Sequence, residues 1–230
     1  MTVSIGVLCL DTIFEKIPGH IRNTSTFDFP VEYQIVEGAT AERIVNQADP
    51  AMLGPFIEAA RALEARGVAA ITGACGFLVI FQKELADSVG VPLYSSSLIQ
   101  LPMVYRMIPA HRSVGLLVAR AQSLTRRHLA AIGAEDVPVC IGGMSEQPEF
   151  REVMLEGQRA ELDAAKLEGE VLTVVDGLAH ANPDLGALVI ECTDLVPFAA
   201  AIQARLDVPV FDIVTLTTMV HASLTRRPYG

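Results

Sequence analysis

The feature that most constrains the fold is a pattern that occurs twice along the chain. In the first half, a strand-like run at 67–72 leads to Cys75 after two intervening residues, and in the second half a run at 186–191 leads directly to Cys192. A helix-like stretch begins at each cysteine. The recurrence of apolar run, thiol and helix in the same order predicts a duplicated α/β unit, with one thiol contributed by each half.

The spacing around the two cysteines supports this interpretation. A Val-Pro pair begins sixteen residues beyond each cysteine and is followed by an apolar and then an aromatic residue, at 91–94 and at 208–211. Earlier apolar runs at 5–8 and 114–117 also match. The duplication is therefore expected to cover most of the chain.

Short apolar runs alternate with longer alanine-rich amphipathic ones, which is typical of parallel sheets covered by helices. Strands are predicted at 3–9, 31–36, 68–72, 91–94, 113–118, 137–141, 186–191 and 208–211. Helices are predicted at 52–66, 77–89, 97–107, 122–132, 149–180, 195–206 and 214–224. The segment 17–26 has the proline, glycine and small polar residues of an irregular loop, at the strand edge where open α/β sheets place ligands.

Composition limits the classes of function. The 230 residues are 51% hydrophobic and 19% charged, enough to bury the core of one large domain or two small lobes. The net charge of −10 disfavours nucleic acid and anionic lipid surfaces as partners. No apolar run reaches the roughly 18 residues of a membrane span, and the N-terminal run, broken at Asp11, lacks signal-peptide features. Four cysteines without Cys-x-x-Cys spacing indicate neither a disulfide scaffold nor a zinc site, so a cytoplasmic location is expected.

A thiol at the start of a helix suits acid/base chemistry. Unpaired N–H groups and the helix dipole there are expected to lower the pKa of a cysteine. Gly76 and Thr193 follow the two cysteines and offer amides and a hydroxyl to a carboxylate or an enolate. Thiols on opposite faces of a small carbon acid could remove a proton and supply one. Cys9 and Cys140 lie inside strand-like runs and are predicted to be core residues.

Other polar residues are weaker candidates for the site. Asp11 and Thr12 follow the first strand, where they could bind a substrate cation or cap a turn. Asn23 in the loop is expected to line the pocket. Ser96 and Asp212 occupy equivalent places after the two Val-Pro strands, Ser96 facing substrate and Asp212 behind it.

The remaining polar residues are assigned structural roles, and sequence motifs for metals and nucleotides are missing. Ser97 is predicted to be a helix N-cap, and Arg22 to be solvated. The five histidines have no metal-ligand spacing, and no glycine-rich phosphate loop follows a strand. No metal or cofactor is therefore expected.

The segments Gly-Ala-Cys-Gly-Phe at 73–77 and Glu-Cys-Thr-Asp at 191–194 resemble the aspartate/glutamate/hydantoin racemase superfamily, and the resemblance extends over nearly the whole chain. It implies two α/β lobes with parallel sheets and a site in the cleft between them. It also implies a cofactor-independent acid/base pair and a homodimer or other homo-oligomer. The lobes would comprise 1–95 with 211–230, and 96–210.

By this resemblance Cys75 and Cys192 carry over as the catalytic pair, and Thr193 matches the threonine of a Cys-Thr motif. Asp11 falls where the family has an acidic residue after its first strand. We expect Gly76, Phe77 and Asp194 also to contact substrate and Glu191 to lie behind them.

The chain departs from the amino-acid racemases at two points. Those enzymes typically continue the first cysteine with Asn-Thr, where Gly76 and Phe77 stand here, and glutamate racemases have histidine at the place of Asp194. The Cys-Gly-Phe-Leu variant is similar to the branch that includes algal dimethylsulfoniopropionate lyases. Hydantoin racemases, maleate isomerases and arylmalonate decarboxylases are further relatives by fold.

The leading expectation is racemisation at the α-carbon of a small carboxylate of the aspartate or glutamate type, since two like bases suit a near-symmetric reaction. The first alternative is β-elimination from a dimethylsulfoniopropionate-like substrate, and decarboxylation is the next. Two non-enzymatic alternatives are a small-molecule binding protein and a redox-responsive protein in which Cys75 and Cys192 form a reversible disulfide.

Overall fold

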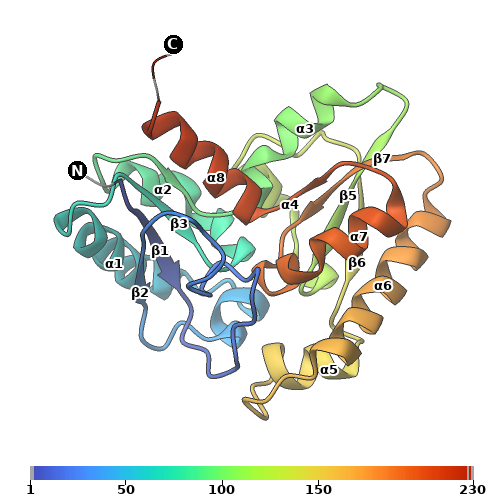
Figure 1. Cartoon of the computed structure of the whole chain (residues 1–230), viewed down its shortest axis with the longest axis horizontal. Coiled ribbons are helices and arrows are strands. Elements are labelled where there is room, and N and C mark those ends of the chain that lie inside the picture. Colours follow the sequence, from blue (N-terminus) through green and yellow to red (C-terminus); the bar gives the residue numbers. More distant parts are fainter. Residues whose placement is uncertain (1–2, 227, 229–230) are drawn as a thin grey trace.

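The computed structural model describes residues 3–226 and 228 as two parallel four-stranded sheets flanked by helices (Figure 1). The strand order is β2-β1-β3-β4 in the first sheet and β6-β5-β7-β8 in the second, so the same winding occurs twice. The α/β class and the two-lobed arrangement are thus confirmed. The limits of the lobes, 1–95 with 211–230 and 96–210, remain a prediction.

The strands lie close to their predicted positions. The first sheet contains β1 (Ile5–Cys9), β2 (Val31–Ile35), β3 (Ala70–Gly73) and β4 (Leu93–Tyr94). The second contains β5 (Ser113–Val118), β6 (Val139–Gly143), β7 (Leu185–Ile190) and β8 (Val210–Phe211). The central strands β1, β3 and β7 are buried along their whole length, which explains why continuous apolar runs identified them.

Helical segments connect the strands. In the first half they are η1 (Glu42–Asn46), η2 (Pro50–Met52), α1 (Leu53–Ala65), η3 (Gly76–Phe81), α2 (Gln82–Asp87), η4 (Ser97–Gln100) and α3 (Leu101–Met107). In the second half they are η5 (Ala121–Ser123), α4 (Arg126–Ala130), α5 (Pro148–Phe150), η6 (Arg151–Leu155), α6 (Ala164–Ala181), η7 (Thr193–Phe198), α7 (Ala199–Leu206) and α8 (Ile213–Leu224). The short turn η1 was not predicted, and the helix expected at 122–132 is interrupted before Thr125, which caps α4.

The prediction of one long helix at 149–180 is wrong. The chain leaves the helical conformation after η6, passes through Gly157 at a φ of 61°, and re-enters it at α6. Glu149 causes part of this turn, because its buried carboxylate accepts hydrogen bonds from the Asp163 N–H (2.9 Å) and the Arg159 guanidinium (2.6 Å). These charges therefore fold a loop back on itself, whereas the sequence pattern suggested a solvated helix face.

The two halves join at the carboxyl ends of their central strands. The Thr193 hydroxyl donates a hydrogen bond to the Ala74 carbonyl (2.9 Å), and the Ser97 hydroxyl donates one to the Ile190 carbonyl (2.7 Å). This arrangement brings the residues after β1, β3, β5 and β7 around one cavity. A functional site is expected at such an edge.

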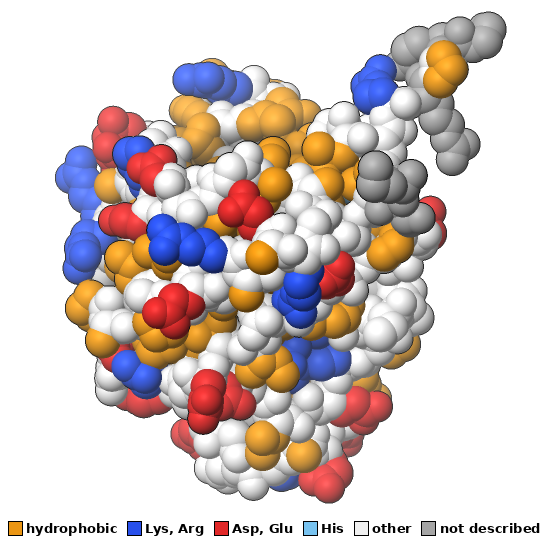
Figure 2. Space-filling model, turned by 90° about the vertical axis from the view of Figure 1, so that its left-hand side faces the viewer, with side chains coloured by type: hydrophobic (Ala, Val, Ile, Leu, Met, Phe, Trp, Pro, Cys, Tyr) orange, Lys and Arg blue, Asp and Glu red, His pale blue; other side chains and the backbone are white. Residues whose placement is uncertain are grey.

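The surface carries both signs of charge. On the face in Figure 2, acidic and basic side chains are interspersed with hydrophobic ones. Within 3–226 and 228, no helix has the length and apolar character that crossing a bilayer would require.

Candidate active site

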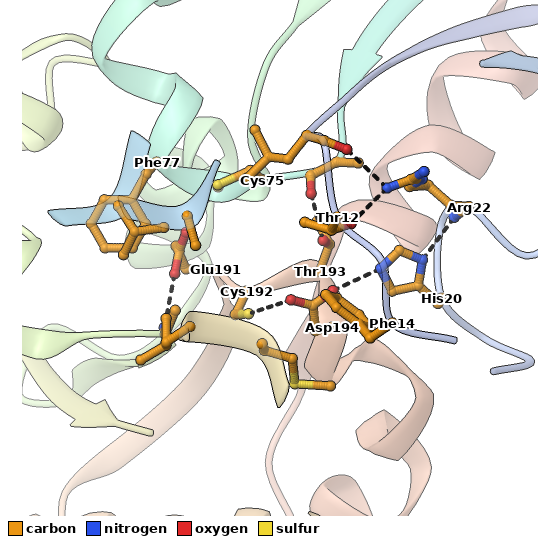
Figure 3. A pocket seen from close by; sticks show the side chains of 18 of the residues that line it. Thr12, Phe14, His20, Arg22, Cys75, Phe77, Glu191, Cys192, Thr193 and Asp194 are labelled. Carbon is orange, nitrogen blue, oxygen red and sulfur yellow. Dashed lines mark hydrogen bonds and ion pairs between the residues drawn. The ribbon is translucent and has the colours of Figure 1, made fainter. Parts of the chain in front are cut away.

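A cavity of about 490 Å³, its mouth included, lies where the two halves meet. Figure 3 shows that Cys75 and Cys192 both border it, together with side chains from the segment that follows β1. The two thiols that the repeat singled out thus lie in one site. Cys9, by contrast, is fully buried in β1, and Cys140 lies in β6, so neither lines this cavity.

Each cysteine occupies the same local position. Cys75 is the N-cap of η3 and Cys192 the N-cap of η7, both with extended backbone. In each case the carbonyl of the cysteine accepts the amide of the residue three positions on, Leu78 (3.2 Å) or Leu195 (3.1 Å). The prediction that each thiol begins a helical turn is therefore correct.

The electrostatic expectation for the thiols is wrong in direction. Burial raises the pKa of both thiols well above the ordinary value, and nearby carboxylates raise it further. For Cys75 the main carboxylate is Glu191, and for Cys192 it is Asp194. Amides around the caps oppose these effects and do not overcome them. The resting protein therefore holds two thiols, and a thiolate must be generated by transfer of a proton to another group.

Glu191, predicted to lie behind the residues that contact substrate, lines the cavity itself. Its side chain is 1% exposed and accepts a hydrogen bond from the Ala119 amide (3.2 Å). Burial raises the pKa of this carboxyl to about 8. Gly76 makes room for it, because a Cβ at position 76 would collide with the Glu191 side chain, its Cγ lying 2.6 Å away. Close packing across the two halves therefore accounts for the glycine after Cys75.

Asp194 links Cys192 to a histidine from the other half. Its Oδ2 accepts the Cys192 S–H (3.7 Å), and its Oδ1 accepts Nε2–H of His20 (2.8 Å). The tautomer follows from the Arg22 amide, which donates to Nδ1 of the same ring (2.9 Å), so that Nε2 carries the proton. Burial lowers the pKa of His20, consistent with a neutral ring.

A cation and an aromatic ring complete the wall beside this chain of hydrogen bonds. The Lys16 ammonium lies 3.0 Å from the centroid of the Phe14 ring and donates to the Phe14 carbonyl (2.7 Å). Burial lowers the pKa of Lys16 to about 8. Arg22, expected to be solvated, donates instead to the Leu10 carbonyl (3.1 Å) and the Thr12 hydroxyl (2.9 Å).

Several predicted site residues border the cavity. They are the two cysteines with Thr12, Gly76, Phe77, Glu191, Thr193 and Asp194. Lys16 and His20 were missed, although both lie in or next to the irregular loop predicted after the first strand. A lone lysine or histidine in a loop carries no periodic signal, so only the position of the loop at the strand edge could have indicated them.

Four predicted residues lie away from this cavity. Asp11 accepts the Gly38 amide (3.2 Å) on the outer side of the segment, and Asn23 folds back to donate to the Lys16 carbonyl (2.5 Å). Ser96 is the N-cap of η4, the role that the sequence assigned to Ser97. Asp212 is the N-cap of α8. Each of these side chains satisfies backbone N–H or C=O groups, and their helix and loop roles account for their positions.

The chain is similar to known proteins in sequence and in fold. No family model matches the chain. It is 32% identical to dimethylsulfoniopropionate lyase 6 of Emiliania huxleyi (strain CCMP1516), over 98% of this chain and 61% of that protein. It is also 32% identical to lyase 7 of the same strain, over 98% and 68%. It is 28% identical to the dimethylsulfoniopropionate lyase of Durusdinium sp. clade D, over 92% and 71%. The chain spans 61% of the length of lyases 6 and 3, the first two relatives.

Solved structures agree on the fold at lower identity. Allantoin racemase from Klebsiella pneumoniae superposes with a TM-score of 0.68 at 16% identity, covering 97% of this chain and 87% of that one. Arylmalonate decarboxylase gives 0.64 at 15% identity, covering 96% and 92%. These enzymes catalyse different reactions, so the likeness establishes the fold alone.

Proposed function

Because the chain belongs to the aspartate/glutamate/hydantoin racemase superfamily, in the branch that holds the algal dimethylsulfoniopropionate lyases, we propose that it is a lyase for a small β-sulfonio carboxylate such as dimethylsulfoniopropionate. The reaction would release acrylate and dimethyl sulfide. This activity, the first alternative from the sequence, takes the place of amino-acid racemisation as the leading proposal.

The observation that carries the proposal is the inequality of the two thiols. The Cys192 thiol donates a hydrogen bond to Asp194, two residues on (3.7 Å). The matching position after Cys75 is Phe77, and the nearby carboxyl of Glu191, whose pKa is about 8, accepts instead from the Ala119 amide. Racemisation needs two groups that exchange roles. An elimination needs one base, so a site with one thiol beside an acceptor suits the lyase better.

In this mechanism Cys192 passes its proton to Asp194 and, as thiolate, takes the α-proton of the substrate. The electrons of the broken C–H bond form the Cα=Cβ bond, and those of the Cβ–S bond leave with dimethyl sulfide. Cys75, as a thiol, donates a hydrogen bond to the substrate carboxylate, which gains negative charge as the α-proton is removed. The proposal requires no cofactor.

The wall of the cavity provides both charges that a zwitterionic substrate needs. The Lys16 ammonium attracts the carboxylate, while the Asp194 carboxylate, before it takes the Cys192 proton, attracts the sulfonium. Lys16 has a pKa of about 8, so it loses its positive charge as the pH rises through that value. Substrate affinity should accordingly weaken above about pH 8.

Racemisation of a small carboxylate is the second candidate, favoured by the presence of two buried thiols at matching caps. The two reactions differ in what happens at the β-carbon, so a single assay can separate them.

The test is incubation of the reduced protein in D₂O with dimethylsulfoniopropionate, aspartate, glutamate and a hydantoin, followed by NMR. The lyase proposal predicts acrylate and dimethyl sulfide, lowered by about 10²-fold or more in Cys75→Ser and in Cys192→Ser. Cys140→Ser, a thiol outside the cavity, is the matched control and should retain full activity. Deuterium incorporation with inversion and no acrylate would instead establish the racemase.

A further inference from the structure

A partly buried chain of hydrogen bonds runs from the backbone through His20 and Asp194 to Cys192. His20 is 3% exposed. Its Nδ1 accepts the Arg22 amide (2.9 Å) and its Nε2–H donates to Asp194 Oδ1 (2.8 Å). The other carboxylate oxygen faces the thiol at 3.7 Å. Both oxygens of Asp194 are thus engaged, one by a donor that fixes the carboxylate and one by the thiol (Figure 3).

The two halves of the molecule share this chain of hydrogen bonds. His20 belongs to the segment after β1, whereas Asp194 lies in η7. The preceding Gly19, with a φ of 94°, lies so close to η7 that a Cβ there would be 2.9 Å from Pro197 Cα. The Thr26 hydroxyl donates to the His20 carbonyl (2.7 Å) and accepts the Gly19 amide (3.1 Å). The loop is therefore folded so that the ring has one position against η7.

We propose that His20 is a positioning residue that acts through Asp194 on Cys192, holding the carboxylate so that Oδ2 can accept the thiol proton. The proposal rests on the acid/base role of Cys192 in the proposed function. In the step itself, the S–H bond of Cys192 breaks and an O–H bond forms on Asp194. Negative charge moves from carboxylate to sulfur, His20 keeps its proton, and no electrons are exchanged with another molecule.

Other titratable groups lie near His20 and Cys192, and a test must separate their effects from that of His20. Lys16 and Arg22 face His20, while Glu191 and Cys75 face Cys192, and all four influence their proton affinities. A useful readout must therefore report on Cys192 itself. It should also compare side chains at position 20 that differ only in whether they can donate a hydrogen bond.

The experiment measures the rate of alkylation of Cys192 by iodoacetamide against pH, by peptide mass spectrometry, in a Cys75→Ser background. His20→Gln keeps a donor near the place of Nε2–H, whereas His20→Leu keeps bulk without a donor. Without the donor, Oδ2 of Asp194 is no longer held opposite the thiol, so the carboxylate takes the thiol proton less readily. We expect alkylation at pH 8.5 to be about tenfold slower in His20→Leu, one unit in pKa, and near wild type in His20→Gln. His180→Gln, on the exposed end of α6, is the matched control.

Two results would overturn the proposal. One is alkylation of His20→Leu at the wild-type rate. The other is equal slowing in His20→Leu and His20→Gln, which would indicate a general role in packing. If His20→Leu folds poorly, His20→Ala replaces it as the variant without a donor. In an Asp194→Asn background neither variant should slow alkylation further, and any additional slowing contradicts an action through Asp194.

The alkylation assay contains no substrate. Absence of acrylate from wild type would therefore refute the proposed lyase without affecting the measured link between His20 and Cys192. If the lyase is confirmed, kcat should fall at least about tenfold in His20→Leu with KM changed less than about threefold, since the proposal places the action of His20 on Cys192 rather than on substrate binding.

Discussion

Gly76 and Glu191 pack directly against each other across the two halves. A methyl group at position 76 would meet the Glu191 side chain and its carbonyl oxygen, and the carbonyl is held in place by the backbone. We expect Gly76→Ala to lower the free energy of unfolding by about 1–3 kcal/mol and to disturb the site. Urea denaturation followed by circular dichroism measures this change.

Gly169→Ala is the matched control for that substitution. Gly169 lies inside α6 with nothing within 4 Å of a new Cβ. Alanine there should raise the free energy of unfolding by about 0.5–1 kcal/mol. If both variants changed stability equally, close packing at Gly76 would not be the cause.

The buried carboxyl of Glu191 makes stability depend on pH. Its pKa rises from an ordinary value of 4.5 to about 8 in the folded protein. Between these values the folded state binds a proton that the unfolded state has released, so the free energy of unfolding falls as pH rises. The slope approaches about 1.4 kcal/mol per pH unit for this group.

Glu191→Gln removes this titration and should flatten the profile. Stability is best compared between pH 7.5 and 8, where His20, with its lowered pKa, is neutral in the folded state and largely neutral in the unfolded state. Profiles of equal slope for wild type and Glu191→Gln would show that the carboxyl is ionised in the folded protein.

The sequence predicted the residues at the repeated positions and missed those whose role depends on how a loop folds. Cys75, Cys192 and Thr193 were identified because both halves repeat the same strand and turn. His20 and Lys16 come to the cavity only because the segment after β1 folds against η7. The raised pKa of the thiols was missed for a related reason, since burial depends on tertiary contacts that a helix-cap argument omits.

Among the elements, the turn between η6 and α6 depends on a buried ion cluster. Glu149 is 1% exposed and lies 2.6 Å from Arg159 and 3.2 Å from Lys166, and these contacts, led by the Arg159 hydrogen bond, lower its pKa to about 2. We expect Glu149→Gln to destabilise the protein by about 1–3 kcal/mol at pH 7 and to expose Arg159 to trypsin. Limited proteolysis with mass spectrometry locates the cut.

The same cluster predicts a dependence on pH. Because the pKa of Glu149 is depressed, its stabilising contribution is complete above the ordinary value of 4.5 and is lost as the pH falls towards 2. The difference in stability between wild type and Glu149→Gln should therefore shrink below pH 4.5. Glu168→Gln, an exposed position on α6, is the control and should match wild type. A constant difference down to pH 3 would contradict the assignment.

The predicted helices and strands agree with the structure where the local sequence pattern determines them. They differ from it where tertiary contacts determine the fold. Strands β1, β3 and β7 are buried throughout, so their apolar runs identified them. The prediction of one helix at 149–180 was wrong because Glu149 and Arg159 form a hydrogen bond across a turn. Composition alone cannot distinguish charged residues that bind each other in this way from those on a solvated helix face. The sequence gives no sign of η1, a short turn that precedes α1.

For the molecule as a whole, the two halves should unfold together. A shared hydrophobic cluster includes β1 and β3 of one sheet and β7 of the other, and hydrogen bonds such as Arg120 to Asn46 (2.9 Å) join the halves. We expect a single transition in urea, with peptides from both sheets losing protection from hydrogen exchange at the same concentration. Protection lost from one sheet first would show that the halves are independent folding units.

The split construction of the cavity also affects the protein while it is being synthesised. Cys75 is 8% exposed in the finished fold, and its cover includes Glu191 and Thr193 from the far end of the chain. A ribosome needs on the order of 10 s to add the residues between them. During that interval the Cys75 thiol lacks the residues that bury it in the complete fold, so dissolved oxidants can reach it. Cys75 is therefore most open to oxidation during synthesis, before the second half of the chain folds and covers it.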